Sequence, residues 1–200
     1  SYLIEGGPSR DLPRTKAMII REPELFAAIM SRLADLAAAF LRVQIENGAS
    51  AVQVFDSWVG ALPARLYREH VLPHTRRVFD HVADLGVPRV HFAVGANHLA
   101  GDMASAGNDV LGVDFRIDLD QVDPAIRSTM ALQGNLDPAV LLTDEPTITT
   151  EVRRVLRSGR DLHGHVFNPG HGVLPDTPAD NVTAAVRAVH EFGEPFEGVS

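Results

Sequence analysis

Hydrophobic residues recur at three- and four-residue spacing in the first quarter of the chain. These apolar positions are Leu25, Phe26, Ile29, Met30, Leu33, Leu36, Ala37, Phe40 and Leu41. The spacing predicts a long amphipathic helix over residues 23–46, because residues three and four apart lie on one helical face. Asn47-Gly48 is a typical helix stop, since glycine readily adopts the left-handed backbone of a C-terminal cap.

The pattern then changes to short β-prone runs that alternate with helical segments. The runs predict five strands, at residues 51–55, 89–94, 109–114, 130–133 and 165–168. The helical segments lie at 63–85, 98–106, 119–127, 138–142, 149–158 and 178–192. Pro73 is expected to divide the first of these into two helices, because proline lacks the amide hydrogen that a helix interior uses. Strands separated by helices indicate a parallel sheet built from βαβ units.

The last predicted helix has marked ends. Thr177 is expected to cap its first turn with its hydroxyl, with Pro178 as the first helical residue and Asp180 favourable to the helix dipole. Gly193 follows the last apolar position and is expected to end the helix.

Small or polar residues follow four of the predicted strands. They occupy residues 56–60, 95–98, 134–138 and 169–172. Each segment taken alone is explained by chain turning, since glycine and proline favour turns. Several together favour a functional site, because parallel α/β folds carry their sites at the carboxyl ends of the strands.

Two side chains in these segments are candidates for chemistry. His171 lies between two glycines, which leave its imidazole unshielded and let the backbone approach a ligand closely. Ser57 has two alternatives of similar weight, a functional role and the capping of the next helix.

Other polar groups favour structural roles. His163 and His165 resemble a metal-binding pair, but they lie where the last strand begins, so a surface role is expected. Asp118, Asp120 and Asp123 lack the glycine and glutamate of a calcium loop and are interpreted as a solvated helix start.

Composition narrows the function classes. The 200 residues carry a formal net charge of -8, which disfavours nucleic acid or an anionic membrane as a partner. Cysteine is absent, which excludes disulfides, thiolate metal sites and cysteine nucleophiles from this chain. No apolar run has the length of a membrane span, and no glycine-rich phosphate-binding motif is present. One domain over residues 1–200 and a cytoplasmic location fit these features.

Several short motifs, taken in order, resemble the uroporphyrinogen decarboxylase family. They are Tyr2-Leu3-Ile4-Glu5-Gly6-Gly7, Phe55-Asp56-Ser57, Gly112-Val113-Asp114, Leu132-Gln133-Gly134-Asn135-Leu136-Asp137-Pro138 and Asn168-Pro169-Gly170-His171-Gly172. The resemblance extends over essentially the whole chain, and its fourth and fifth motifs are specific.

The resemblance implies a fold and an activity. It implies a TIM barrel in a cytoplasmic homodimer that needs no cofactor or metal. The implied reaction removes the four acetate carboxyls of uroporphyrinogen III, a tetrapyrrole, to give coproporphyrinogen III for haem biosynthesis. Only five of the eight barrel strands are expected here, and 200 residues fall below the roughly 250 of a typical barrel. The chain is therefore expected to be the C-terminal part of such a barrel, and inactive alone.

The resemblance also implies roles for three residues. Tyr2, Ser57 and His171 match the substrate-binding tyrosine, serine and histidine of the family, and Tyr2 and His171 are expected to act in catalysis. All three are expected to follow strands. The arginine-rich loop and the aspartate that meet the substrate in the family have no counterpart in this chain.

Two rival interpretations remain. The first is a zinc- and cobamide-dependent methyltransferase of the same superfamily, which the absence of cysteine disfavours. The second is an inactive half-barrel that acts only in assembly through its exposed strand edges.

Overall fold

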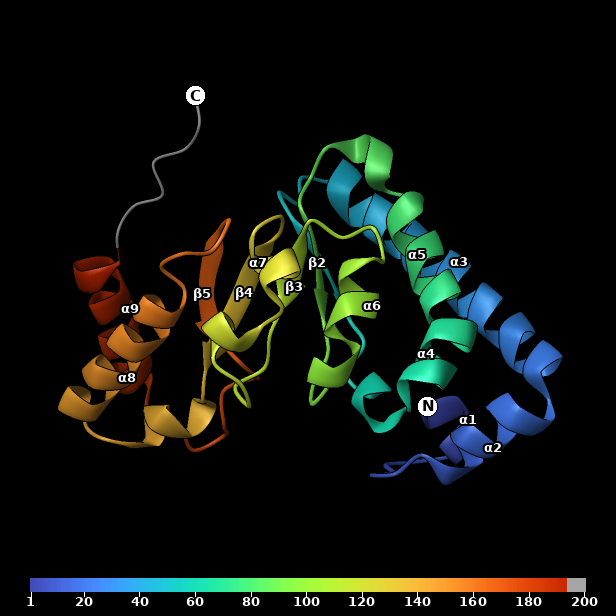
Figure 1. The fold of residues 1–200 in the computed structure, drawn as a ribbon, viewed down its shortest axis with the longest axis horizontal. Helices are drawn as coiled ribbons and strands as arrows, with labels where there is room; N and C mark the ends of the chain where they lie inside the picture. Colours follow the sequence, from blue (N-terminus) through green and yellow to red (C-terminus); the bar gives the residue numbers. More distant parts are fainter. Residues whose placement is uncertain (194–200) are drawn as a thin grey trace. The chain divides into compact units, whose positions relative to one another are not determined.

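Five short strands alternate with helices in the computed structural model, which describes residues 1–193. The strands are β1 Val52–Phe55, β2 Arg89–Phe92, β3 Val110–Gly112, β4 Ala131–Leu136 and β5 His165–Pro169. They form one sheet in chain order, and the β1–β2 and β4–β5 pairs are parallel. The predicted partial barrel of five strands is confirmed, since each predicted strand overlaps an observed one. The predicted end of the fourth strand is wrong, because β4 continues through Leu136 by pairing with β5, so residues 134–136 belong to the strand rather than to the segment after it. The chain divides into two units, Ser1–Val110 and Leu111–Ser200, which are described separately (Figure 1).

The first unit is mostly helical. Its α-helices are α1 Tyr2–Glu5, α2 Pro13–Arg21, α3 Pro23–Glu46, α4 Ala64–His70, α5 Leu72–Asp80 and α6 Ala100–Ala104. Its 3₁₀ helices are η1 Val59–Ala61, η2 Ala83–Leu85 and η3 Asn97–Leu99. The bounds predicted for α3 are confirmed, and the predicted break near Pro73 lies between α4 and α5. The sequence pattern did not predict α1 or α2.

Helix α3 packs beside α5 (Figure 1). Leu41 of α3, Val52 of β1 and Val78 of α5 belong to one buried apolar cluster. In the parallel β1–β2 pair, Val54 lies opposite His91 and Phe55 opposite Phe92. This register places the residues that follow both strands at the same edge of the sheet.

The second unit combines the β4–β5 pair with helices (Figure 1). Its helices are η4 Leu119–Gln121, α7 Pro124–Arg127, η5 Pro138–Leu142, α8 Glu145–Ser158 and α9 Ala179–Phe192. Helix α8 packs against α9. Ile148, Val152 and Val155, at helical spacing on α8, are fully buried and form the apolar face of that helix.

Two helix starts in this unit differ from the predictions. Helix α8 begins at Glu145 rather than residue 149, because the Asp144 carboxylate accepts a hydrogen bond of 3.0 Å from the Thr147 amide. The capping role predicted for Thr177 is wrong: Pro178 is the N-cap of α9, and no side chain caps the helix. Thr177 lies one position too early to reach the free amides of the first turn.

The prediction for the two histidines at the start of β5 is confirmed for one of them and wrong for the other. His163 is exposed as predicted, but the surface role predicted for His165 is wrong, because its imidazole is partly buried and packs against Gly159. His165 Nε2 lies 2.8 Å from the carbonyl oxygen of Gly134, so Nε2 carries the hydrogen. Burial lowers the pKa of His165, which keeps the ring neutral.

Within residues 1–193, no helix combines the length and the apolar character that crossing a membrane requires.

Candidate functional site

Ser57 lies in the turn that directly follows β1. Its side chain is half-buried. Neither η1 nor α4, the next two helices, has a side-chain cap, so the capping alternative for Ser57 is wrong. The residue therefore remains a candidate for binding at the carboxyl end of the strand.

The ring of Tyr2 packs against the loop that carries Ser57. It meets Trp58 edge-on, with ring centroids 5.8 Å apart and an interplanar angle of 82°. About half of each side chain stays exposed, 52% for Tyr2 and 46% for Trp58. In the first unit, Tyr2 thus lies against Trp58, the residue that directly follows Ser57. Tyr2 lies in α1, so its expected position after a strand is not seen in the described residues.

A group of polar contacts surrounds the residue that precedes Ser57. Asp56, the preceding residue, accepts hydrogen bonds at Oδ2 from His91 Nε2 at 3.0 Å and from Thr75 Oγ1 at 3.3 Å. The side chain of His91 is fully buried, and that of Asp56 is 23% exposed. Sequence reasoning missed this contact, because it joins two strands and depends on their register.

The hydroxyl of Tyr67 is buried near the same carboxylate. Burial raises the pKa of Tyr67 strongly, and the negative charges of Asp56 and Asp102 raise it further. Tyr67, which is fully buried, therefore keeps its proton over the physiological range.

The loop after β1 touches the end of β2. A Cβ atom at Gly60 would lie 2.3 Å from the carbonyl oxygen of Val94, so only glycine allows this approach. The Asp56 amide donates to the Phe92 carbonyl at 2.8 Å. Ser57 and Trp58 therefore lie between two fixed points of the backbone.

His171 lies in the second unit, in the segment after β5, and its side chain is exposed as predicted. The preceding Gly170 is buried, and its amide donates to the carbonyl oxygen of Leu136 at 2.7 Å. A Cβ atom at Gly170 would lie 2.5 Å from the backbone nitrogen of Phe115. The first glycine of the Gly-His-Gly motif thus packs against backbone, while a Cβ at Gly172 would meet nothing within 4 Å.

A cation that sequence reasoning did not single out lies near this segment. Arg116 follows Phe115 directly, and its guanidinium donates at 2.6 Å to the fully buried carboxylate of Asp114. The same guanidinium lies 4.7 Å from the centroid of the Phe115 ring. Because 48% of the Arg116 side chain is exposed and an arginine has five N–H donors, the fixed group can still bind a carboxylate.

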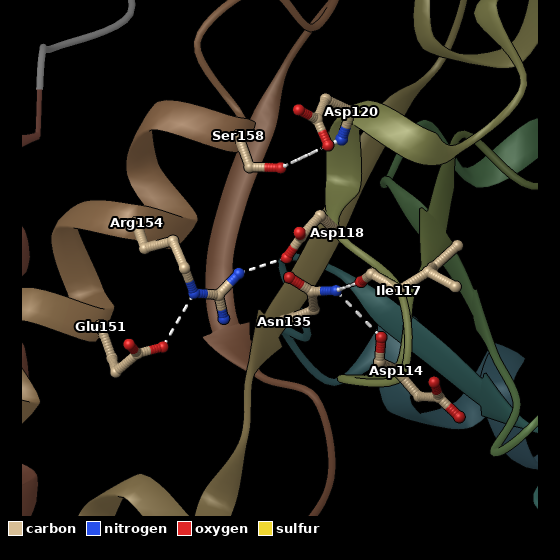
Figure 2. Close-up of polar contacts among 8 residues, drawn as sticks. All are labelled: Asp114, Ile117, Asp118, Asp120, Asn135, Glu151, Arg154 and Ser158. Atoms are coloured by element: carbon tan, nitrogen blue, oxygen red, sulfur yellow. Dashed lines mark hydrogen bonds and ion pairs between the residues drawn. The ribbon is translucent and has the colours of Figure 1, made fainter.

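The segment after β3 is anchored to β4 (Figure 2). The buried amide of Asn135 donates to the carbonyl oxygens of Asp114 at 2.9 Å and Ile117 at 2.6 Å. Asn135 belongs to the Gln-Gly-Asn-Leu-Asp-Pro motif of β4, so this motif holds the neighbouring segment in place.

Further contacts fix the same segment to α8 (Figure 2). Arg154 binds Asp118 and, at 2.8 Å, Glu151, while the Ser158 hydroxyl and Asp120 exchange two hydrogen bonds. The acidic residues interpreted as a solvated helix start therefore have separate roles. Of Asp118, Asp120 and Asp123, it is Asp123 whose carboxylate caps a helix, accepting from the Ala125 amide at 2.9 Å.

In the part of the chain that the structure describes, no three His, Asp or Glu side chains are grouped closely enough to hold a metal ion.

Curated relatives of this chain belong to the family that its motifs resemble. A family model described as uroporphyrinogen decarboxylase (URO-D) matches residues 1–192. Among curated relatives, uroporphyrinogen decarboxylase of Streptomyces coelicolor is 54% identical over 190 residues, or 95% of this chain. The same-named proteins of Streptomyces griseus and Rhodococcus erythropolis are 53% and 51% identical over 96% of the chain.

The chain spans about half the length of these relatives, with 52% to 56% of each matched. Among solved structures, a methyltransferase from Methanosarcina mazei superimposes with a TM-score of 0.79 over 90% of this chain and 53% of its own. Its sequence is 22% identical to this chain, so the likeness shows a shared fold alone.

Proposed function

The chain belongs to the uroporphyrinogen decarboxylase family, and we propose that the protein containing it decarboxylates the four acetate side chains of uroporphyrinogen III. The observation that carries the proposal is the placement of the motif residues. Ser57 follows β1 and His171 follows β5, and each remains accessible to a ligand. Parallel α/β folds use these strand ends for catalysis.

The proposed reaction needs a place for the electron pair that carbon dioxide leaves behind. Protonation of the pyrrole carbon next to the acetate makes the ring cationic, and the carbon–carboxylate bond then breaks with its electrons flowing into the ring. A proton returns to the exocyclic methylene carbon and the ring carbon loses its proton, which restores the pyrrole with a methyl group. The protein has to orient the acetate, stabilise a cationic ring and move protons.

We assign the binding of substrate carboxylates to the hydroxyl groups of Tyr2 and Ser57 and to the imidazole of His171. Arg116 is assigned to the same task, because its guanidinium is fixed by Asp114 and Phe115 and partly exposed. Tyr2 and His171 would also orient the reacting ring. An octacarboxylate substrate requires such donors even though the chain carries a net charge of -8.

The proposal extends to the whole protein. We propose a cytoplasmic homodimer that needs no cofactor, and a 200-residue chain that is inactive alone. The coverage of about half of each relative supports the last point, since the remaining length would have to supply the other part of the site.

Anaerobic incubation of the full-length protein with uroporphyrinogen III, followed by oxidation and chromatography, tests the activity. The expected products are porphyrins with seven, six, five and four carboxylates. A product profile that keeps all eight carboxylates would overturn the decarboxylase assignment.

His171→Ala tests the assignment of the histidine. Losing a hydrogen bond to a charged group costs about 1.5–3 kcal/mol, so turnover should fall by roughly 10–150-fold. Partly decarboxylated intermediates should accumulate, while circular dichroism stays unchanged. The matched variant His163→Ala changes an exposed histidine before β5 and should keep the wild-type rate. An unchanged rate and product distribution in His171→Ala would remove this residue from the site.

Methyl transfer to a thiol is the second candidate, and only the shared fold of the methyltransferase from Methanosarcina mazei favours it. Bound zinc in the purified full-length protein, together with transfer of a methyl group to a thiol, would support it over decarboxylation.

A further inference from the structure

His91 is buried at a position where an apolar side chain would be expected. It lies on β2 with none of its side chain exposed. Its ring meets Phe79 edge-on, with centroids 5.5 Å apart, and its Nδ1 lies 3.4 Å from the carbonyl oxygen of Met103. A buried imidazole loses its hydration, so a compensating hydrogen bond is required.

The short contact of His91 is with Asp56. Nε2 lies 3.0 Å from Asp56 Oδ2, and an ionised carboxylate can only accept, so Nε2 is the donor. Thr75 of α5, itself 6% exposed, reaches the same oxygen at 3.3 Å. Two buried donors from two different elements thus fix one carboxylate oxygen.

Asp56 directly precedes Ser57, so holding the Asp56 side chain in place also restricts the backbone at Ser57. The Asp56 carbonyl also accepts from the Val59 amide at 3.1 Å, which closes the turn that carries Ser57. Farther along, Gly60 packs on the Val94 carbonyl. Because the turn is held at Asp56 and at Gly60, the backbone of Ser57 is fixed, and its hydroxyl is presented to a ligand from one position.

We propose that the Asp56–His91 pair is a positioning device for Ser57, and that it sets the affinity of the site for substrate carboxylates. His91 touches no substrate in this assignment and acts through Asp56. The proposal rests on the proposed function, because that function makes Ser57 a substrate-binding residue. A group held in advance binds with less loss of conformational freedom, so loosening the turn should weaken binding.

A double-mutant cycle in the full-length protein tests the proposal. His91→Met keeps similar bulk but removes the donor, and Ser57→Ala removes the positioned hydroxyl. With uroporphyrinogen III as substrate, His91→Met should lower kcat/KM by about tenfold, mainly through KM. In the Ser57→Ala background the same change should cost less than about twofold, because the group that it positions is gone.

Two further variants separate positioning from general destabilisation. His91→Gln keeps an N–H donor and should restore kcat/KM to within about threefold of the wild type. Val90→Ala shortens the buried neighbour of His91 on β2 and should leave KM unchanged. An equal loss for His91→Met in both backgrounds, or no rescue by His91→Gln, would overturn the proposal.

Hydrogen exchange gives a readout that does not depend on catalysis. The peptide containing residues 56–60 should exchange faster in His91→Met, return to the wild-type rate in His91→Gln and stay unchanged in Val90→Ala. Wild-type protein that leaves uroporphyrinogen unchanged would defeat the proposed function. Unchanged exchange in His91→Met would instead defeat the positioning role, whatever the activity.

Discussion

The two glycines beside His171 differ in what surrounds them. A methyl group at Gly170 would overlap the backbone of Phe115, whereas a methyl group at Gly172 would enter open space. We therefore expect Gly170→Ala to lower the free energy of unfolding by about 1–3 kcal/mol, because backbone must move to admit it. The matched variant Gly172→Ala should change it by less than about 0.5 kcal/mol.

Urea denaturation followed by circular dichroism measures both changes. Equal effects of the two variants would contradict the packing role of Gly170. If Gly170→Ala also displaces the backbone of His171, its kcat should fall in the decarboxylation assay while that of Gly172→Ala does not.

Local sequence was sufficient for part of the candidate site. His171 could be singled out because flanking glycines and a preceding strand are both local signals, and its exposure is confirmed. The contact of Asp56 with His91 could not be predicted, since it depends on Val54 lying opposite His91 in the β1–β2 register. Arg116 was missed for a similar reason. Its guanidinium is fixed by Asp114, and no sequence pattern indicates that this aspartate is buried.

At the level of elements, one side chain links β4 to the segment after β3. Asn135→Ala would remove the amide that donates to the carbonyl oxygens of Asp114 and Ile117. Because each of these two hydrogen bonds contributes about 0.5–1.5 kcal/mol, we expect a loss of stability of about 1–3 kcal/mol. Thermal denaturation measures it. Asn168→Ala removes an exposed amide from β5 and is the control, with a change below about 0.5 kcal/mol. A similar melting temperature for both variants would contradict this role of Asn135.

Element boundaries were predicted best where several signals agree. Helix α3 has periodicity over its whole length and a stop at Asn47-Gly48, and its bounds are confirmed. Helix α2 was missed because only Thr15 and Ile19 of its nine residues are buried, which leaves almost no apolar period to detect. Helix α8 was predicted too short, since its cap at Asp144 precedes the first apolar residue by four positions.

The sheet has two ends in the residues that the structure describes, because β1 and β5 each pair with one other strand. Unpaired strand edges favour association with another chain. We therefore expect the 200-residue chain by itself to form dimers or larger species at micromolar concentration, as measured by light scattering after size exclusion. A monomer at all concentrations would contradict the expectation.

Two lysine variants test whether the unpaired edge of β5 causes this association. Val166 lies on β5 and is 47% exposed, while Val186 lies on α9 and is 52% exposed. Val166→Lys should reduce the associated fraction, because charge on an edge strand opposes pairing, and Val186→Lys should not. Equal reduction by both variants would indicate general surface repulsion instead.

The edge-on contact of Tyr2 with Trp58 has a practical consequence. Trp58 is the single tryptophan of this chain, and it is half exposed beside Ser57. Tryptophan fluorescence of this chain therefore comes from a single residue, which lies next to the proposed binding groups. In this chain, a shift in the wavelength of maximum fluorescence would report ligand binding or loosening of the turn without an added dye.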